Sequence, residues 1–266
     1  MKIEQHVGGS LLSDTETLDA VMEGSIDFCH NMVSYASGVI PDLALLAVPG
    51  YYAGDNYLAF AAAVQQPLEA IYAKYDIKYL GSNYQGTTTF VCSKRLITKP
   101  DDLKGLSFRT SGTWLGKAME NWGASAITIP LGDLTTALER GTVDGTYTGW
   151  TITGPFALYE VAKYVTFTSI TESFGNLLMS MDTWNSLTDA QKAIIEEAAK
   201  LYIEESYHIG YALRDEYYSA MEDAGTELYT LTAAEEKVFT DISLKLFDEI
   251  EPTLSPDGKA LLAILK

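Results

Sequence analysis

The sequence predicts an α/β protein with two lobes, a ligand cleft between them and one long helix that spans both. Strand-like and helix-like segments alternate between residues 101 and 150. The 266 residues also exceed the roughly 250 at which a single hydrophobic core stops growing. A nearly unbroken helical pattern from Asp189 to Ala224 would measure roughly 50 Å, which is longer than a small lobe is wide.

Residues 101 to 150 are predicted to form a strand, helix, strand, helix, strand unit. The first strand ends near Arg109, and the next helix has an apolar face made by Leu115, Ala118, Met119 and Trp122. A second strand is expected over 126–130, a second helix ends at the glycine in position 141, and a third strand covers 143–148. Ligands bind at the carboxyl ends of strands in open α/β sheets. The candidate binding residues there are Arg109, Ser111, Tyr147, Thr148 and Trp150.

Before this unit, the pattern predicts strands over 1–7, 26–32, 77–81 and 87–92. Ser13 and Glu16 have the spacing of a capping box for a short helix, and a helix over 56–75 is expected to be interrupted at Pro67. The carboxyl end of the 26–32 strand, from Asn31 to Ser34, should reach the cleft if this lobe is doubly wound. The pair Tyr51-Tyr52 is interpreted as packing in preference to ligand stacking.

After this unit, a helix is predicted over 155–163, and strands over 164–168 and 177–181. Phe174 and Asn176 lie on the crossing between these strands and are candidate ligand contacts. The long helix starts at a capping box of Thr188 and Gln191. Its predicted buried stripe comprises Ile194, Ile195, Ala198, Leu201 and Tyr202. The lobes are assigned as residues 1–86 plus 175–214, and 87–174 plus 215–266.

Composition excludes several classes of function. With 36 acidic and 18 basic side chains, the formal net charge of -18 opposes binding to nucleic acid and to anionic membranes. No apolar run approaches the ~20 residues of a spanning helix, and residues 1–7 do not resemble a signal peptide. The two cysteines and three histidines lack metal-ligand spacing, and no dinucleotide or phosphate loop is present. We therefore expect no metal, no cofactor and buried free thiols at Cys29 and Cys92.

Arg109 is the strongest candidate for binding an anion. It ends a predicted strand and precedes Thr110-Ser111-Gly112 at a helix start, where free backbone N–H groups add to the donors of its guanidinium. The alternative is a surface arginine paired with one of the many acidic side chains. A guanidinium beside hydroxyls and aromatic rings suits a small organic carboxylate.

Several motifs resemble the solute-binding proteins of tripartite ATP-independent periplasmic (TRAP) transporters. They are DLKGLSFRT at 102–110, WGA at 122–124 with Pro130, ALERGTVDG at 137–145, LYEVAKY at 158–164, GGSLLSD at 8–14, GSID at 24–27 and SKR at 93–95. Their order and spacing match that family over most of the chain. The resemblance implies a periplasmic-binding-protein-like fold whose lobes close on a ligand, braced by the long helix.

The resemblance also shows departures from the family. The resemblance starts after the family's first strand and helix, so we expect a shortened chain with an unpaired strand edge. Thr88 stands where many members have a second ligand-facing arginine, and Thr148 where they have an asparagine. Both replacements weaken the case for a dicarboxylate or a sialic acid. A monocarboxylate with an apolar or aromatic body is therefore the expected ligand.

The family implies a periplasmic monomer that delivers its ligand to the membrane subunits of a TRAP transporter, without inserting into the membrane itself and without binding nucleic acid. Two alternatives stay open at this point. One is a ligand-sensing domain for a signalling partner. The other is an enzyme acting on a similar carboxylate, which would need a base or nucleophile near the substrate; only hydroxyls and Tyr147 are expected near Arg109.

Overall fold

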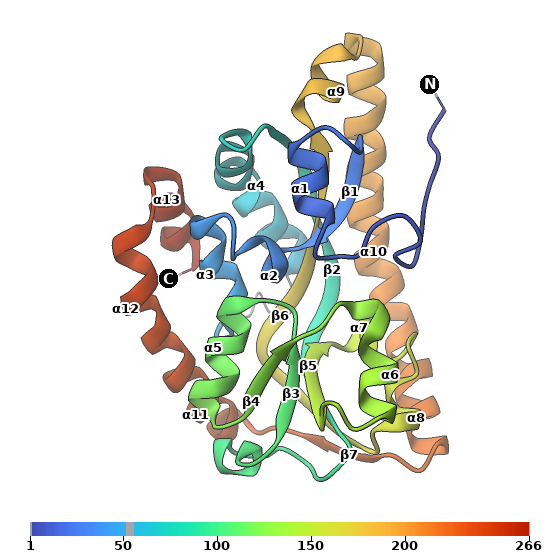
Figure 1. Cartoon of the computed structure of the whole chain (residues 1–266), viewed down its shortest axis with the longest axis vertical. Coiled ribbons are helices and arrows are strands. Elements are labelled where there is room, and N and C mark those ends of the chain that lie inside the picture. Colours follow the sequence, from blue (N-terminus) through green and yellow to red (C-terminus); the bar gives the residue numbers. More distant parts are fainter. Residues whose placement is uncertain (1, 52–55, 266) are drawn as a thin grey trace.

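The computed structural model describes residues 2–51 and 56–265. The described strands form one mixed sheet of seven strands in the order β1-β6-β2-β5-β3-β4, and β7 pairs with β6 (Figure 1). They are β1 (Phe28–Met32), β2 (Ile77–Cys92), β3 (Ser107–Thr110), β4 (Ser125–Thr128), β5 (Gly145–Gly149), β6 (Tyr164–Ser180) and β7 (Glu227–Thr230). The strand, helix, strand, helix, strand unit predicted within 101–150 corresponds to β3, α5, β4, α6 and β5.

Helices cover both faces of this sheet (Figure 1). The α-helices are α1 (Thr17–Met22), α2 (Val33–Ala36), α3 (Ala44–Ala47), α4 (Tyr57–Ala73), α5 (Thr113–Trp122), α6 (Leu134–Glu139), α7 (Trp150–Thr153), α8 (Leu158–Val161), α9 (Met181–Ser186), α10 (Asp189–Asp223), α11 (Ala233–Ser243), α12 (Phe247–Ile250) and α13 (Pro256–Leu265). None of these described helices combines the length and the apolarity that crossing a membrane requires.

Two strands, β2 and β6, connect the lobes of the two-lobed fold. Each was predicted as two separate strands, and this prediction is wrong because each is continuous. Their antiparallel pairing shifts register near Tyr79, Tyr84 and Thr87, where bulges bend the ladder without ending it. The glycines in this segment therefore mark bends within one strand and not the ends of two strands. Gly81 and Gly86 have φ of 143° and 80°, which glycine adopts more readily than other residues. These two continuous strands contribute residues to the lining of the cavity described below.

Buried side chains gather in separate cores. The first draws mainly on residues 18–84 and 246–262, and the second on residues between 90 and 170 together with Leu231 and Phe239. A third lies under α6, α8 and the end of α10. Because 246–262 pack with the first core, the C-terminal segment returns to the part of the molecule where the chain begins (Figure 1). The predicted lobe boundaries stay a prediction.

The long helix α10 is confirmed, and it runs past both lobes (Figure 1). Its capping box is also present, since the Thr188 hydroxyl accepts from the Gln191 N–H at 3.3 Å. The predicted buried stripe is largely wrong: Ile194 and Leu201 are 61% and 54% exposed, whereas Ile195 and Ala199 are buried. The helix contacts the sheet mainly along β2, so only a narrow strip of it is covered.

Three further predictions also differ from the structure. Residues 2–7 form no strand and Ile3 and Val7 are exposed, because this segment pairs with no described strand. Helix α4 runs uninterrupted through Pro67, since Leu68 and Ile71 beside it are fully buried and tertiary packing outweighs one lost backbone hydrogen bond. The helix expected over 155–163 is reduced to the short α8.

Candidate functional site

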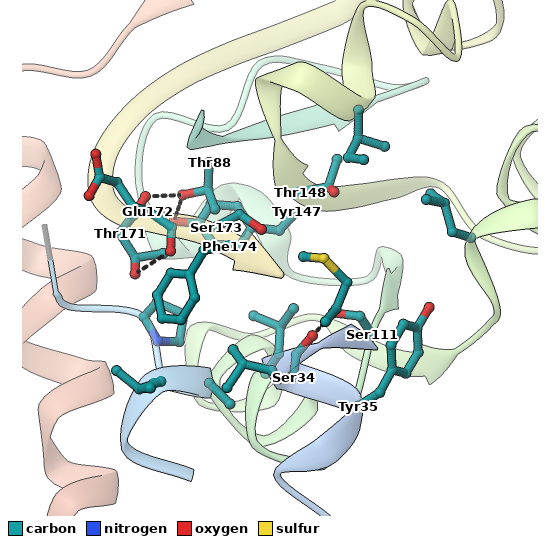
Figure 2. A pocket seen from close by; sticks show the side chains of 18 of the residues that line it. Ser34, Tyr35, Thr88, Ser111, Tyr147, Thr148, Thr171, Glu172, Ser173 and Phe174 are labelled. Atoms are coloured by element: carbon teal, nitrogen blue, oxygen red, sulfur yellow. Dashed lines mark hydrogen bonds between the residues drawn. The ribbon is translucent and has the colours of Figure 1, made fainter. Parts of the chain in front are cut away.

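A cavity of about 60 Å³ lies where the first and second cores meet the long strands β2 and β6 (Figure 2). Its lining comes from three parts of the chain. The first part supplies Met32, Val33, Ser34, Tyr35, Leu46, Ala47 and Pro49; the second supplies Arg109, Ser111, Leu115, Leu131, Tyr147, Thr148 and Ile152; the strands β2 and β6 supply Thr88, Thr171, Glu172, Ser173 and Phe174. This volume is below the ~300 Å³ at which ligand pockets begin, so a ligand needs the walls to separate for entry.

Arg109 lies on β3, and 3% of it is exposed. Its Nε donates to the backbone carbonyl of Ile129 at 2.8 Å, and its Nη2 donates to the phenol oxygen of Tyr35 at 2.6 Å. Burial lowers the pKa of Arg109, while Tyr35 and the Asp14 carboxylate act against that shift. A guanidinium stays protonated at neutral pH despite such a shift. The site therefore contains a buried cation.

The polar partners of this cation are neutral. Within the described chain, no carboxylate oxygen lies within 4.0 Å of the Arg109 guanidinium, although Asp14 is close enough to influence its pKa. Asp14 instead accepts from the Leu131 N–H at 3.3 Å. A guanidinium has five N–H donors, and two of them are used by Ile129 and Tyr35. The remaining donors leave room for an anion.

Hydroxyl groups form a second polar region of the lining. The Thr88 hydroxyl bonds with the phenol of Tyr147 and lies 3.2 Å from the carbonyl oxygen of Thr171. Figure 2 shows Thr88 and Thr171 together on one side of the cavity, with Ser34 and Ser111 on the other. Burial raises the pKa of Tyr147, so its phenol remains neutral and able to form hydrogen bonds. This region can bind carbonyl or hydroxyl oxygens of a ligand.

Apolar side chains complete the wall. Phe174 is buried and its ring meets that of Phe60 at 5.7 Å in an edge-to-face arrangement. Phe60 also packs on Tyr51, with ring centroids 4.6 Å apart, which is the packing role expected for Tyr51. Tyr52 lies outside the described residues. A cavity that is lined by both apolar side chains and one cation suits a ligand with one charged end.

Six of the nine predicted site residues line this cavity: Arg109, Ser111, Thr148, Tyr147, Thr88 and Phe174. Their contact with a ligand stays a prediction.

The other three lie outside the lining and have other partners. Trp150 packs 6.4 Å from the ring of Tyr217, and Asn176 bonds to Ser82 and Tyr72. Asn31 donates to the carbonyl oxygen of Asp14 and to the hydroxyl of Thr17. Asn31 and Asn176 lie on strands, where neighbouring side chains alternate between the two faces of the sheet, whereas Trp150 begins the helix α7.

Ser34 belongs to the stretch 31–34 that was expected to reach the cleft, and it lines the cavity. Sequence reasoning missed Tyr35, Thr171, Glu172 and Ser173, and the signal for Tyr35 was its position directly after that stretch. The strand ends at Met32, and the turn into α2 places the next residues in the lining. Thr171, Glu172 and Ser173 lie on β6 near a shift in its pairing with β2, and the periodicity of the sequence does not show where such a shift occurs. Across the described ranges, no three His, Cys, Asp or Glu side chains gather into a metal site.

Comparisons with known proteins agree with this architecture. The model of the bacterial extracellular solute-binding proteins of family 7 matches residues 1–253. An uncharacterised protein of Haemophilus influenzae is 30% identical over 84% of this chain and 68% of its own length. A monocarboxylate 2-oxoacid-binding periplasmic protein of Nostoc is 26% identical over 93% of this chain and 70% of its own length.

A solved TRAP periplasmic solute-binding protein of Xanthobacter autotrophicus with bound β-D-galacturonate has the same fold. Its TM-score is 0.89 at 22% identity, covering 99% of this chain and 88% of that one. Among the curated relatives, the share of their own length that this chain spans ranges from 53% to 70% in the first three. The match over 1–253, with the two-lobed fold, shows that the chain belongs to the bacterial extracellular solute-binding proteins of family 7.

Proposed function

We propose that this protein captures a small monocarboxylate with an apolar body between its lobes, outside the cytoplasm, and delivers it to the membrane subunits of a TRAP transporter. One observation supports this function above all others. The Arg109 guanidinium is buried in a cavity with neutral partners only, and a buried charge is costly unless an opposite charge completes its hydrogen bonds. A carboxylate satisfies that requirement by a charge-assisted pair.

The lining supports the choice of a monocarboxylate. Beside Arg109 it holds hydroxyls, apolar side chains and the acidic side chain of Glu172, and Arg109 is the one cation among the described lining residues. A second carboxylate on the ligand would lack a cationic partner. The Nostoc relative carries the name of a monocarboxylate 2-oxoacid-binding protein, which is consistent with this class of ligand. The 2-oxo group of such an acid could bond with the hydroxyls of Thr88 or Thr148.

The test is calorimetric titration with short 2-oxo acids, 2-hydroxy acids and aromatic acids, followed by the variant Arg109→Ala. We expect the variant to bind the best acid at least about tenfold more weakly, because truncating one partner of a buried charged pair costs roughly 2–5 kcal/mol. Arg214→Ala is the matched control, since Arg214 is exposed and pairs with Asp215. Equal affinity of Arg109→Ala and the unmodified protein would remove Arg109 from the site.

A further inference from the structure

Two hydrogen bonds join opposite walls of the cavity. The Ser34 and Ser111 hydroxyl oxygens lie 2.6 Å apart, and Arg109 donates to the Tyr35 phenol at 2.6 Å. Ser34 and Tyr35 belong to α2, whose buried neighbours pack in the first core, whereas Arg109 lies on β3 and Ser111 precedes α5. Figure 2 shows Ser34 and Ser111 facing each other. All four side chains are polar, so water can replace these bonds when the walls separate. The contact is therefore suited to repeated opening and closing.

Gly112 makes this approach possible. Its φ of 166° is extended backbone that any residue can adopt, so its conformation does not require glycine. A Cβ at this position would lie 1.9 Å from the carbonyl oxygen of Ser34, far inside contact distance. The obstacle would be backbone atoms, which cannot turn aside as the end of a flexible side chain can. A residue larger than glycine would hold the two walls apart.

Tyr35 has an unused donor at this contact. A phenol has one O–H donor and can accept as well, and the Tyr35 oxygen accepts from Arg109. Among the described residues, the Tyr35 hydroxyl donates to no acceptor. Burial raises the pKa of Tyr35 and outweighs the opposing influence of Arg109, so the phenol keeps its proton at neutral pH. Tyr35 also lines the cavity, where a ligand would be within its reach.

We infer that Tyr35 is a second ligand-binding residue that joins the site only on closure: its phenol donates to the carboxylate that Arg109 binds, and Gly112 allows the closure. This inference rests on the proposed function and identifies Tyr35 as the residue that contacts the ligand when the same site closes. The anion site is thus divided between the two walls. A hydrogen bond formed only in the closed state lowers the free energy of that state, which couples binding to closure.

The first experiment compares Tyr35→Phe with the unmodified protein by calorimetry, using the acid that binds best among the 2-oxo, 2-hydroxy and aromatic acids. A hydrogen bond to a charged group contributes about 1.5–3 kcal/mol, so we expect binding to weaken by about tenfold or more. Tyr75→Phe is the control, because Tyr75 is partly buried but does not line the cavity. Equal affinity of Tyr35→Phe and the unmodified protein, within twofold, would overturn the inference.

The second experiment separates closure from binding. Small-angle scattering of Gly112→Ala should give a larger radius of gyration than the unmodified protein, with acid present or absent, while the urea unfolding midpoint stays the same. Gly132→Ala is the control, since a Cβ there meets no atom within 4 Å. An unchanged radius in Gly112→Ala overturns the closing contact. If the unmodified protein binds none of the acids, the proposed function fails, yet the scattering comparison still decides whether Gly112 permits closure.

Discussion

Arg109 and Thr88 show how single residues set the properties of the site. Arg109 brings the positive charge, and the neutral oxygens around it leave donors for a ligand. Thr88 stands where an arginine was expected from the resemblance, and its hydroxyl bonds within the wall to Tyr147 and Thr171 instead of adding a second charge. At this scale, the exchange of one side chain changes the number of charges that the cavity can neutralise.

Replacing Thr88 by valine should destabilise the protein, because the shape is kept while a buried hydroxyl is lost. Among the described residues, the Tyr147 phenol would then keep one hydrogen-bond partner, the Thr168 hydroxyl at 3.4 Å. Leaving buried groups without partners costs about 1–3 kcal/mol. The free energy of unfolding in urea measures this loss. Thr142→Val, at an exposed position, should change it by less than about 0.5 kcal/mol, and an equal effect of both variants would contradict the expectation.

The long elements connect the parts of the molecule. The strands β2 and β6 continue through both lobes, and α10 packs against Leu80 and Met179 through Ile195 and against the third core through Met221. Close approaches fix α10 in place: a Cβ on Gly81 would lie 2.1 Å from the side chain of Ile203. These elements therefore join the parts of the chain that line the cavity.

The start of α10 depends on the cap at Thr188, whose N–H also donates to the Gln191 side chain at 2.9 Å. Thr188→Ala removes the hydroxyl acceptor and should lower the free energy of unfolding by about 0.5–2 kcal/mol. Circular dichroism during urea unfolding measures the change. Lys200→Ala is the comparison: its side chain is 78% exposed, its ion pair with Glu204 spans 4.0 Å, and exposed pairs contribute little. A Thr188→Ala loss no greater than that of Lys200→Ala would show that the cap does not stabilise the helix.

For the whole molecule, buried phenols and thiols link stability to pH. Burial raises the pKa of Tyr51 and of Cys29 to about 12 each, and it also raises the pKa of Tyr72 and Tyr79. In the unfolded chain, cysteine and tyrosine lose their protons near pH 8.5 and 10. Above these values the unfolded state binds fewer protons than the native state. Stability must therefore fall as the pH rises.

We expect the thermal midpoint to stay level between pH 7 and 8 and to fall by several degrees by pH 11. A change of 1 kcal/mol shifts the midpoint of a chain of this size by about 2–4 °C. Differential scanning calorimetry gives the midpoint, and phenolate absorbance during an alkaline titration shows when the tyrosines ionise. Ionisation of all tyrosines near pH 10 with the fold intact would contradict the burial argument.

The sequence showed the alternation within 101–150, the cap at Thr188 and the identity of Arg109, because helix caps, turn glycines and periodic apolar faces are local signals. Which individual positions are buried was harder to predict from the sequence. Ile194 and Leu201 have the spacing of a buried face, yet they are exposed, because spacing gives the side of a helix and not which side the sheet covers.

By itself, the sequence determined the two-lobed α/β class, the long helix and the one arginine suited to an acid, since each follows from residues that are near one another along the chain. Only the tertiary structure decided that Tyr35 meets Arg109 and that Ser34 approaches Gly112, across separations of more than 70 positions. It also decided that Asn31, Trp150 and Asn176 lie away from the cavity. The physical reason is that such contacts depend on how bent strands place distant segments, and bends in β2 and β6 are set by packing from both sides.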